Sequence, residues 1–318
     1  MLSMWWDGLI LNALALLLAV GLDRALPEPP GRIHPVVWMG RTIAVLERAA
    51  SQRPAPAFIY GCIIVILVTG FSTALSWLAV IALASIHPVA YVTGSAIILR
   101  ATFTVRGLSS AARQTRDALR EGRLEPAQAS LRNLVSRDPT TLTPPLVAAS
   151  AIESVAENTT DSFVGPWLAF AVFGVPGAVA YRAVNTLDSM LGYRGRYEYL
   201  GKASARLDDA LNLIPARLSA LFLLLGGALG RLPMRRAWLI MLRDRQSTAS
   251  PNAGWTMSAI AGLLGVRLEK PEHYVLGEGM REPNAEDIST AIRLAERTAI
   301  LGVIVALGLL TIRHAILG

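Results

Sequence analysis

Long apolar runs alternate with polar connections along the chain, and this pattern is typical of a protein that crosses a membrane several times. The runs lie at about 8–22, 57–84, 86–105, 163–181, 213–230 and 298–312. A spanning helix needs roughly 20 apolar residues, and only the run 57–84 exceeds this length comfortably. Strand patterns are sparse, and no repeat of about 20–50 residues recurs. We therefore expect a mainly α-helical, polytopic integral membrane protein with about 4–6 hydrophobic helices.

The run 163–181 differs from the others because Gly165-Pro166 and Gly174-Val-Pro-Gly177 interrupt it. This composition favours a broken or re-entrant helix, whose non-helical backbone is tolerated at membrane depth only where protein or a water-filled cavity covers it. If every apolar run crossed once, the loops 107–162 and 182–212 would lie on opposite sides and separate two acidic clusters. We expect instead that both clusters face one cavity.

The polar segments predict further helices outside the apolar runs. Arginines at helical spacings between 106 and 143, with Gly122 as a stop between two helices, predict a solvent-facing helical hairpin. We expect one membrane-embedded catalytic domain over residues 1–318, with a polar helical insert at 106–160 and a polar loop region at 231–297.

Arginine dominates the basic side chains. The 30 basic residues contribute to a formal net charge of +7, and only Lys202 and Lys270 are lysines. Arginine suits a bidentate grip on phosphates and carboxylates, although the positive-inside bias of membrane proteins is an equally good explanation of most of these charges. No nucleic-acid-binding module accompanies them, so we expect no nucleic-acid partner. The single Cys62 excludes a disulfide, a zinc cluster or an iron–sulfur framework within one chain.

A cluster of carboxylates precedes the interrupted run. Glu153, Glu157 and Asp161 recur at a spacing of four, which places them on one face of a helix. Ionisable residues this close to a membrane are expensive and indicate a function. Such a face suits Mg²⁺, which takes one or two carboxylates and completes its shell with water and phosphate. Structural ion pairing with nearby arginines is the alternative.

A second polar cluster follows the interrupted run. Asn185 and Asp188 share a helix face at a spacing of three, and they either coordinate a cation jointly or form hydrogen bonds between helices. Asp208 and Asp209 repeat the theme at the next membrane boundary, and Asp208 is slightly favoured as the functional member of the pair. The surrounding arginines balance charge or bind a polyanion. They are Arg182, Arg194, Arg196, Arg206 and Arg217.

Two loops complete the candidate chemistry. His34 precedes Pro35 at an extended turn, where a lone histidine is more often structural than catalytic. In the loop before residue 255, Ser250 or Asn252 is a candidate cap for the following helix, whose free N–H groups also suit an anion. The alternative is a turn without a ligand, and no Gly-rich phosphate loop with lysine exists. The residues alone predict a membrane-embedded, metal-assisted site for an anionic substrate.

Unusual strings occur in order over almost the whole chain. They are Asp23 with His34-Pro-Val-Val-Trp-Met-Gly40, Arg137-Asp138, Ala151-Ile-Glu-Ser-Val-Ala-Glu-Asn-Thr-Thr-Asp161, Gly174-Val-Pro-Gly177, Tyr181-Arg-Ala-Val-Asn-Thr-Leu-Asp-Ser-Met-Leu-Gly-Tyr193, Ala205-Arg-Leu-Asp-Asp209, Ile214-Pro-Ala-Arg217 and Ser250-Pro-Asn-Ala-Gly254. With these strings the chain resembles the cobinamide-phosphate synthase family of cobalamin biosynthesis, called CbiB or CobD. One departure is Pro139 after Asp138, where the family pattern leads us to expect a small hydroxyl residue.

The resemblance implies a ligase that uses ATP and Mg²⁺. It would join (R)-1-amino-2-propanol, or its O-phosphate, to a propionate carboxylate of adenosylcobyric acid through an acyl phosphate. The implied catalytic residues are Glu157, Asp161, Asp188 and Asp208, and the implied metal ligands are Glu153, Glu157 and Asp161. The implied substrate- and phosphate-binding residues are His34, Asn158, Arg182, Asn185, Arg194, Arg206, Ser250 and Asn252.

The expected partners are the lipid bilayer, the corrinoid and amine substrates, and either a second copy of the chain or other enzymes that act on corrinoids. We expect the protein in the bacterial inner membrane, with its active site toward the cytoplasm. Three alternatives stay open: a Mg²⁺-dependent prenyl- or phosphotransferase, a corrinoid transporter, and a scaffold for corrinoid enzymes. The transferase normally shows paired Asp-x-x-x-Asp repeats, and the transporter would bind cobyric acid without consuming ATP.

Overall fold

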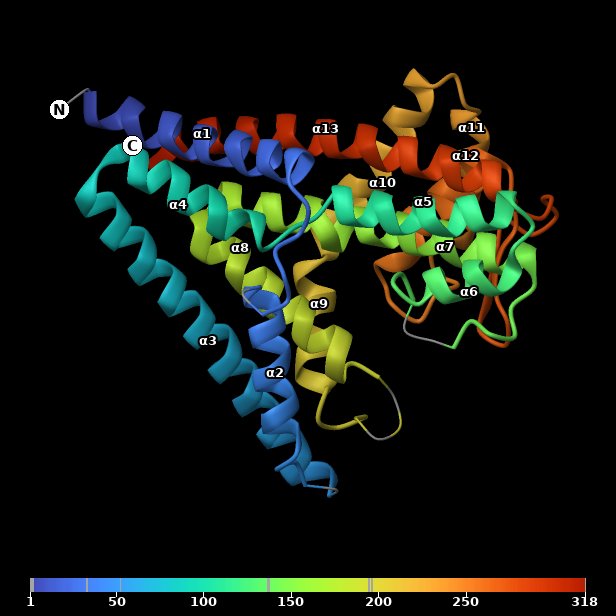
Figure 1. Cartoon of the computed structure of the whole chain (residues 1–318), viewed down its shortest axis with the longest axis horizontal. Helices are drawn as coiled ribbons and strands as arrows, with labels where there is room; N and C mark the ends of the chain where they lie inside the picture. Colours follow the sequence, from blue (N-terminus) through green and yellow to red (C-terminus); the bar gives the residue numbers. More distant parts are fainter. Residues whose placement is uncertain are drawn as a thin grey trace. The chain divides into compact units, whose positions relative to one another are not determined.

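The computed structural model describes residues 3–32, 34–51, 53–135, 138–193, 195 and 197–317, which are mainly helical (Figure 1). They form two compact units. Unit 1 comprises Met1–Thr104, Gly165–Leu211 and Val303–Gly318, and unit 2 comprises Val105–Val164 and Asn212–Gly302. The polar insert and the polar loop region predicted from the sequence both fall within unit 2, and the single catalytic domain stays a prediction.

Unit 1 is built from mostly apolar helices. The helix α1 packs against α4, α3 packs against α4 and α8, and α2 and α9 each pack against α3 and α8. The bounds are α1 (Ser3–Ala25), α2 (Pro35–Glu47), α3 (Pro54–Ile86), α4 (Pro88–Arg100), α8 (Gly165–Leu191), α9 (Lys202–Leu211) and the last part of α13 (Ala285–Leu317).

Two helices of unit 1 begin at the same His-Pro-Val sequence. Pro35 and Pro88 occupy the first turn of α2 and α4, where the missing N–H costs no helical hydrogen bond. His34 and His87 precede them, and the Nδ1 atom of each accepts a hydrogen bond of 3.2 Å from the N–H two residues later. The short sequence therefore satisfies one of the N–H groups that a helix start leaves without a partner.

Within the described residues, four helical segments are long and apolar enough to cross a membrane, and one bent helix pair raises the number to five. This confirms the expected 4–6 hydrophobic helices. The segments are Gly8–Ala25, Pro54–Ile86, Pro144–Leu191 and Ala285–Ile316. The apolar run 86–105 is too short to span by itself, because α4 has only 13 residues and ends at Arg100, whereas a span needs roughly 20.

Helix α3 exposes many large apolar side chains. Ile59, Ile66 and Phe71 are 59%, 69% and 72% exposed, respectively. Soluble proteins rarely expose a contiguous apolar surface of this kind to water. Together with the other long apolar helices, this surface makes the chain an integral membrane protein.

The predicted break in the run 163–181 is confirmed, and it reverses the helix. Gly174 interrupts α8 with a φ of 71° and a ψ of −165°, a conformation that glycine adopts readily because it has no side chain. A Cβ atom on Gly165 would overlap the hydroxyl oxygen of Tyr181, although sixteen residues of straight helix would separate them by about 24 Å. The two halves of α8 therefore fold back on each other, and Pro144–Leu191 is not one straight span.

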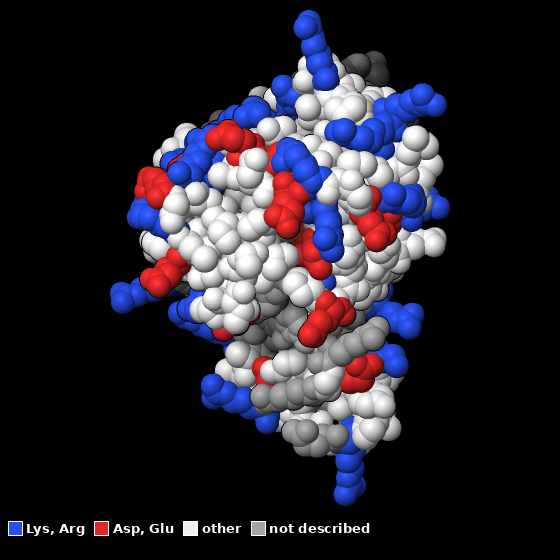
Figure 2. Space-filling model, turned by 90° about the vertical axis from the view of Figure 1, so that its right-hand side faces the viewer, with Lys and Arg blue, Asp and Glu red and all other residues white. Residues whose placement is uncertain are grey.

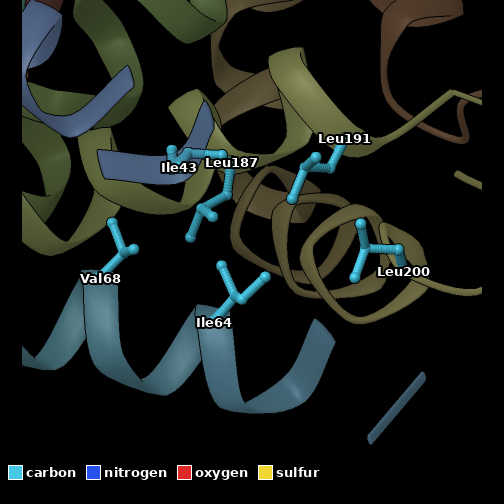
Figure 3. Close-up of a cluster of buried hydrophobic side chains, with 6 residues drawn as sticks. All are labelled: Ile43, Ile64, Val68, Leu187, Leu191 and Leu200. Atoms are coloured by element: carbon cyan, nitrogen blue, oxygen red, sulfur yellow. The ribbon is translucent and has the colours of Figure 1, made fainter. Parts of the chain in front are cut away.

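An apolar cluster fixes the end of the returning half of α8. It joins α2, α3, α8 and the turn before α9 (Figure 3); its members are Ile43, Ile64, Val68, Leu187, Leu191 and Leu200. The backbones approach closely here, because a Cβ atom on Gly61 of α3 would overlap the carbonyl oxygen of Leu200. Close packing of this kind transmits displacements, so it positions the polar residues of the last turns of α8.

Unit 2 surrounds α12, which packs against α7, α10 and α11. The predicted hairpin is confirmed, since α5 and α6 pack together on either side of Gly122, which has a φ of 70°. Strands β1 and β2 pair in antiparallel fashion, with Leu268 opposite Leu276. The bounds are α5 (Arg106–Arg120), α6 (Leu124–Leu131), α7 (Pro144–Thr159), the π-helix η1 (Thr160–Val164), α10 (Leu213–Leu229), α11 (Met234–Asp244), α12 (Ala253–Leu264), β1 (Leu268–Lys270), β2 (Tyr274–Leu276) and the first part of α13.

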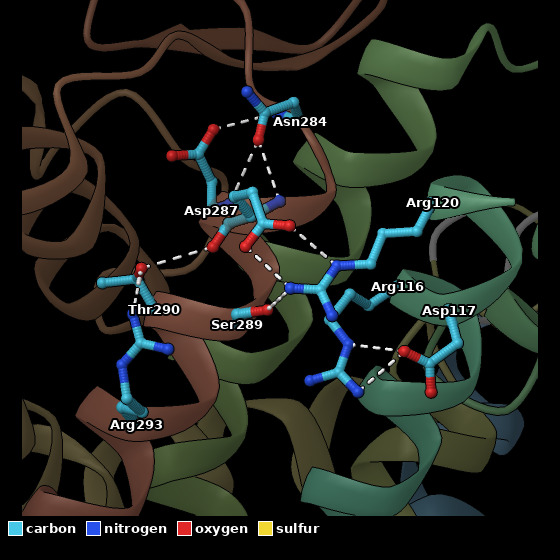
Figure 4. A network of polar contacts seen from close by, with 9 residues as sticks. Arg116, Asp117, Arg120, Asn284, Asp287, Ser289, Thr290 and Arg293 are labelled. Carbon is cyan, nitrogen blue, oxygen red and sulfur yellow. Dashed lines mark hydrogen bonds and ion pairs between the residues drawn. The ribbon is translucent and has the colours of Figure 1, made fainter. Parts of the chain in front are cut away.

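Charged side chains join α5 to the start of α13 (Figure 4). Arg120 donates from Nε and Nη2 to the two carboxylate oxygens of Glu286, at 2.7 Å each. Arg113 pairs with Glu296 at 2.6 Å. Figure 2 shows basic and acidic side chains interspersed over one face. Exposed pairs contribute only about 0.2–1 kcal/mol each, so they orient α5 more than they stabilise it.

Candidate active site

A pocket in unit 1 lies where the ends of α1 and α4 meet the start of α2 and one turn of α8. Its volume is about 310 Å³. Pockets for small organic ligands occupy roughly 300–1,000 Å³, so this one suits a ligand at the small end of that range. The charged and polar residues of its lining are Asp23, Glu28, His34, Arg100, Thr104 and Arg182.

Asp23 brings a buried carboxylate to the pocket from the end of α1. Only 4% of its surface is exposed, and its Oδ1 accepts a hydrogen bond of 3.4 Å from the hydroxyl of Thr104. A buried carboxylate is costly unless it is bonded or paired. Asp23 therefore places a hydrogen-bonded carboxylate in the wall of the pocket.

Arg100 holds the segment between α1 and α2 beside the pocket. It is the last residue of α4, and its Nη2 donates to the carbonyl oxygens of Leu26 and Pro27 at 3.0 and 2.5 Å. Hydrogen bonds from a charged donor are stronger than neutral ones. One side chain thus contributes both positive charge and a fixed position for the neighbouring backbone.

His34 faces the pocket as a neutral ring. Its Nδ1 accepts a hydrogen bond from the N–H of Val36, so the proton of the neutral imidazole lies on Nε2. Burial lowers the pKa of His34 below its ordinary value of 6.5; the carboxylate of Glu28 opposes this, and the guanidinium groups of Arg182 and Arg100 add to it. His34 has the structural role expected of it, as the cap of α2, and it also lines the site.

The pocket carries both signs of charge. Asp23 and Glu28 supply carboxylates, and Arg100 and Arg182 supply guanidinium groups. Such a lining complements a small ligand that has an ammonium group at one end and an anionic group at the other. Neither a purely anionic nor a purely apolar ligand would match all of these groups.

A chain of hydrogen bonds leads from the pocket to α9. Nη1 of Arg182 donates to Oδ1 of Asn185 at 3.3 Å, and Nδ2 of Asn185 donates to Oδ1 of Asp208 at 3.4 Å. Asp208 is buried, with 9% of its surface exposed. The sequence left two roles for Asn185, cation binding and a hydrogen bond between helices. The structure contains the second, between α8 and α9.

Asp188 lies one turn beyond Asn185, at the end of α8 that the apolar cluster fixes. A Cβ atom on Gly192 would overlap its Oδ1, so the carboxylate lies directly against the backbone there. Arg206 on α9 is exposed. Arg194, the remaining predicted residue of this region, lies outside the described residues.

In unit 2, α7 and η1 carry the predicted metal ligands. Glu153 is buried, whereas Glu157 and Asp161 are partly exposed. Along an α-helix, residues four apart rise by about 6 Å, so the carboxylates of Glu153 and Glu157 lie one turn apart on α7. No three His, Cys, Asp or Glu side chains in the described part of the chain form a metal-binding group. One or two carboxylates together with phosphate still suit Mg²⁺, and the predicted magnesium site stays a prediction.

Asn158 spans the change from α-helix to π-helix. Its Nδ2 donates to the carbonyl oxygen of Ser154, and its Oδ1 accepts from the hydroxyl of Ser162, both at 2.9 Å. π-Helical turns are rare and occur frequently at functional sites. The amide of Asn158 supports this turn, and a bound substrate would have to compete with the two serines for it.

The loop before α12 carries the last two predicted residues. Asn252 occupies the N-cap position of α12, but the expected side-chain cap is wrong. Its Oδ1 instead accepts a hydrogen bond of 2.6 Å from Nη1 of Arg217, because a charged donor is the stronger partner. The hydroxyl of Ser250 accepts from the N–H of Asn252 at 3.2 Å.

The structure brings His34, Arg182, Asn185 and Asp208 into one neighbourhood of unit 1, and Asp23 and Arg100 complete the pocket wall. These last two were absent from the predicted site. Asp23 stands in the same string as His34, and Arg100 places a charge inside an apolar run, so the sequence contained a reason to consider both. Nothing in the sequence marked Glu28 or Thr104 as site residues.

Comparison with known proteins decides the family. The family model described as CobD/Cbib protein matches residues 16–296. The chain belongs to the CobD/CbiB family. Cobalamin biosynthesis protein CobD of Dehalococcoides mccartyi is 43% identical over 298 residues, which cover 93% of this chain and 97% of that protein. The CobD protein of Geobacter metallireducens is 41% identical over 272 residues, 85% of each chain. Cobalamin biosynthesis protein CbiB of Salmonella paratyphi B is 37% identical over 298 residues, 89% of this chain and 93% of that protein.

Membership of the CobD/CbiB family confirms the resemblance and gives the chain a role in cobalamin biosynthesis. The strings that carried the resemblance include Asp23, His34 and Arg182, which line the pocket. No solved structure matches the chain.

Proposed function

We propose that this protein is an ATP-dependent, amide-forming ligase of cobalamin biosynthesis. It joins (R)-1-amino-2-propanol, or its O-phosphate, to a propionate carboxylate of adenosylcobyric acid. The observation that carries the proposal is the small pocket of unit 1, whose wall combines Asp23 and Glu28 with Arg100 and Arg182. An amino alcohol phosphate has the size and the two charges that this wall complements.

The amine substrate binds in this pocket, and the corrinoid presents only its propionate arm there. A corrin ring with its side chains is far larger than a cavity of about 310 Å³. Asp23 and Glu28 bind the ammonium group, and Arg100 and Arg182 bind the phosphate or the propionate. His34, as a neutral ring, donates a hydrogen bond from Nε2 without adding charge.

The carboxylate requires activation because its oxygen is a poor leaving group. The γ-phosphoryl group of ATP is transferred to it, which gives an acyl phosphate and ADP. The amine then attacks the acyl carbon: a C–N bond forms, the C–O bond to phosphate breaks, and the departing phosphate takes the proton that the nitrogen loses in this step. Before it attacks, the bound ammonium group must give up a proton to become a neutral amine. We assign the acceptance of this proton to Asp208, which Asn185 links to the pocket residue Arg182.

Mg²⁺ would neutralise phosphate charge during phosphoryl transfer. Glu153, Glu157 and Asp161 are the residues proposed to hold it together with the phosphates of ATP. Carboxylates one turn apart on α7 match the one or two that this ion takes.

We place the protein in the bacterial inner membrane with its active site toward the cytoplasm. ATP is available on that side, and arginine-rich loops favour it. Association with a second copy of the chain, or with other enzymes that act on corrinoids, is compatible with this placement.

The test is amide formation by the detergent-purified protein. It is incubated with adenosylcobyric acid, Mg-ATP and either the free or the phosphorylated amine, and the corrinoid mass is followed. We expect an ATP-dependent gain equal to the amine minus water. Glu157→Gln should unfold at the wild-type temperature and form no amide, whereas Glu121→Gln, which alters an exposed carboxylate of the α5–α6 hairpin, should retain activity. No mass gain with either amine, despite measurable corrinoid binding, would refute the ligase and favour transport.

A further inference from the structure

Two arginine side chains stack on one tryptophan in unit 2. Cζ of Arg217 lies 4.9 Å and Cζ of Arg245 lies 4.6 Å from the ring centroid of Trp255. Arg217 belongs to α10, Arg245 follows the last residue of α11, and Trp255 lies in the first turn of α12. The two guanidinium groups carry like charges, which repel each other across so small a region. Three elements nevertheless converge to hold them together.

No carboxylate of the described chain neutralises this pair. Neither Arg217 nor Arg245 forms an ion pair within the described residues. Asp244 precedes Arg245 in the sequence, but its carboxylate accepts hydrogen bonds from Arg243 and from the N–H of Gly277. Cation–π contact with the indole offsets part of the repulsion. It leaves two positive charges for an external anion.

The start of α12 lies beside the same two arginines. Asn252 directs its side chain to Arg217 and makes no cap for α12, which has 12 residues. The N–H groups of Ala253 and Gly254 have no acceptor within the helix, and the N-terminal end of a helix attracts anions. A Cβ atom on Gly254 would overlap the carbonyl oxygen of Arg245, so glycine allows the end of α11 to lie against the start of α12.

We propose that Arg217, Arg245 and the first turn of α12 bind a phosphate group. Guanidinium groups bind phosphate oxygens in pairs of parallel hydrogen bonds, and Trp255 holds both side chains for this contact. The phosphate belongs either to a soluble polyphosphate or to a lipid headgroup. The identification of the soluble ligand as ATP rests on the proposed function. The phosphate site itself does not depend on that function.

The test measures binding directly, without corrinoid or amine, so that no turnover is needed. The full-length protein is titrated calorimetrically with inorganic tripolyphosphate and with Mg-ATP. Arg245→Gln is the main variant, because the guanidinium of Arg245 makes no hydrogen bond within the described residues. Arg217→Gln is the second variant, and Arg235→Gln, which removes an exposed charge from α11, is the matched control. We expect tripolyphosphate binding about tenfold weaker in Arg245→Gln and unchanged in the control.

A second measurement identifies the source of the phosphate. Native mass spectrometry counts the phosphatidylglycerol molecules that the protein retains from lipid nanodiscs. Weaker tripolyphosphate binding in Arg245→Gln supports a soluble ligand, and loss of retained lipid alone supports a headgroup. If both are unchanged in Arg245→Gln and in Arg217→Gln, the phosphate site is overturned, whatever the amide assay shows. If the variants lose tripolyphosphate while the wild type forms no amide, the site stands and the ligase fails.

Discussion

The reversal of α8 depends on a glycine that lies against a tyrosine ring. Replacement of Gly165 with alanine adds a Cβ atom 2.8 Å from Cε2 of Tyr181, and this atom would also overlap Cζ and the hydroxyl oxygen. Gly165 is buried, and Tyr181 is 4% exposed, so the ring has no open space into which to move. Either the ring leaves its packed position or the two halves of α8 separate.

The magnitude follows from two opposing effects. Overpacking of a buried site costs about 1–3 kcal/mol, and contact with three ring atoms places this clash in the upper part of that range. Alanine is intrinsically better than glycine in a helix by about 1 kcal/mol. We therefore expect Gly165→Ala to destabilise the protein by about 1–2 kcal/mol. In a Tyr181→Ala background the same change should be neutral or stabilising, because the clashing atoms are absent.

The assay is thermal unfolding in detergent, followed by circular dichroism, for the two single variants and the double variant. The matched control is Gly70→Ala in α3, where a Cβ atom meets nothing within 4 Å. We expect a midpoint a few degrees lower for Gly165→Ala and no loss for Gly70→Ala. Tyr181→Ala lowers the midpoint by itself because it empties a buried site, so the double variant is compared with Tyr181→Ala. If Gly165→Ala and Gly70→Ala unfold alike, and the Tyr181→Ala background changes nothing, the two halves of α8 do not pack as described.

Acidification should destabilise the wild type more than His34→Asn, which retains a cap acceptor but does not titrate. Burial lowers the pKa of His34 in the folded state. The unfolded chain therefore binds the proton first as the pH falls below 6.5, and the protein loses stability in that range. If the stability of the wild type and of His34→Asn changed in parallel between about pH 8 and 5, this reasoning would be contradicted. Arg313→Leu should lower the free energy of unfolding by about 1–3 kcal/mol. The reason is that Arg313 donates hydrogen bonds of 3.5 and 3.3 Å to two carbonyl oxygens near the break in α8. Unfolding at the wild-type midpoint would show that these carbonyl oxygens have other partners. Gly192→Ala should displace the carboxylate of Asp188 and slow amide formation by about a hundredfold, and wild-type turnover would argue against a role of that carboxylate.

Local features of this protein could be predicted from its sequence. The break at Gly174 and the stop at Gly122 both use a positive φ, and the α2 start uses the His34-Pro35 pair. These features depend on atoms a few residues apart, which a short stretch of sequence specifies. The number of apolar helices also followed from the runs. The run 86–105 holds a shorter helix than its length suggests, because average hydropathy does not register the end of α4 at Arg100.

The pocket was decided by the tertiary structure. Asp23, Arg100 and Arg182 are far apart along the chain and meet only because α1, α4 and α8 belong to one packed unit. The spacing of Glu153 and Asp161 predicted one regular helix, but the structure places Glu153 in α7 and Asp161 in the π-helix η1 that follows it, a change of winding that the spacing does not register. Helix starts and breaks are set by short-range sterics and hydrogen bonds, which the sequence determines by itself. A pocket requires long-range packing that selects one partner among many chemically equivalent residues, and only the folded chain makes that selection.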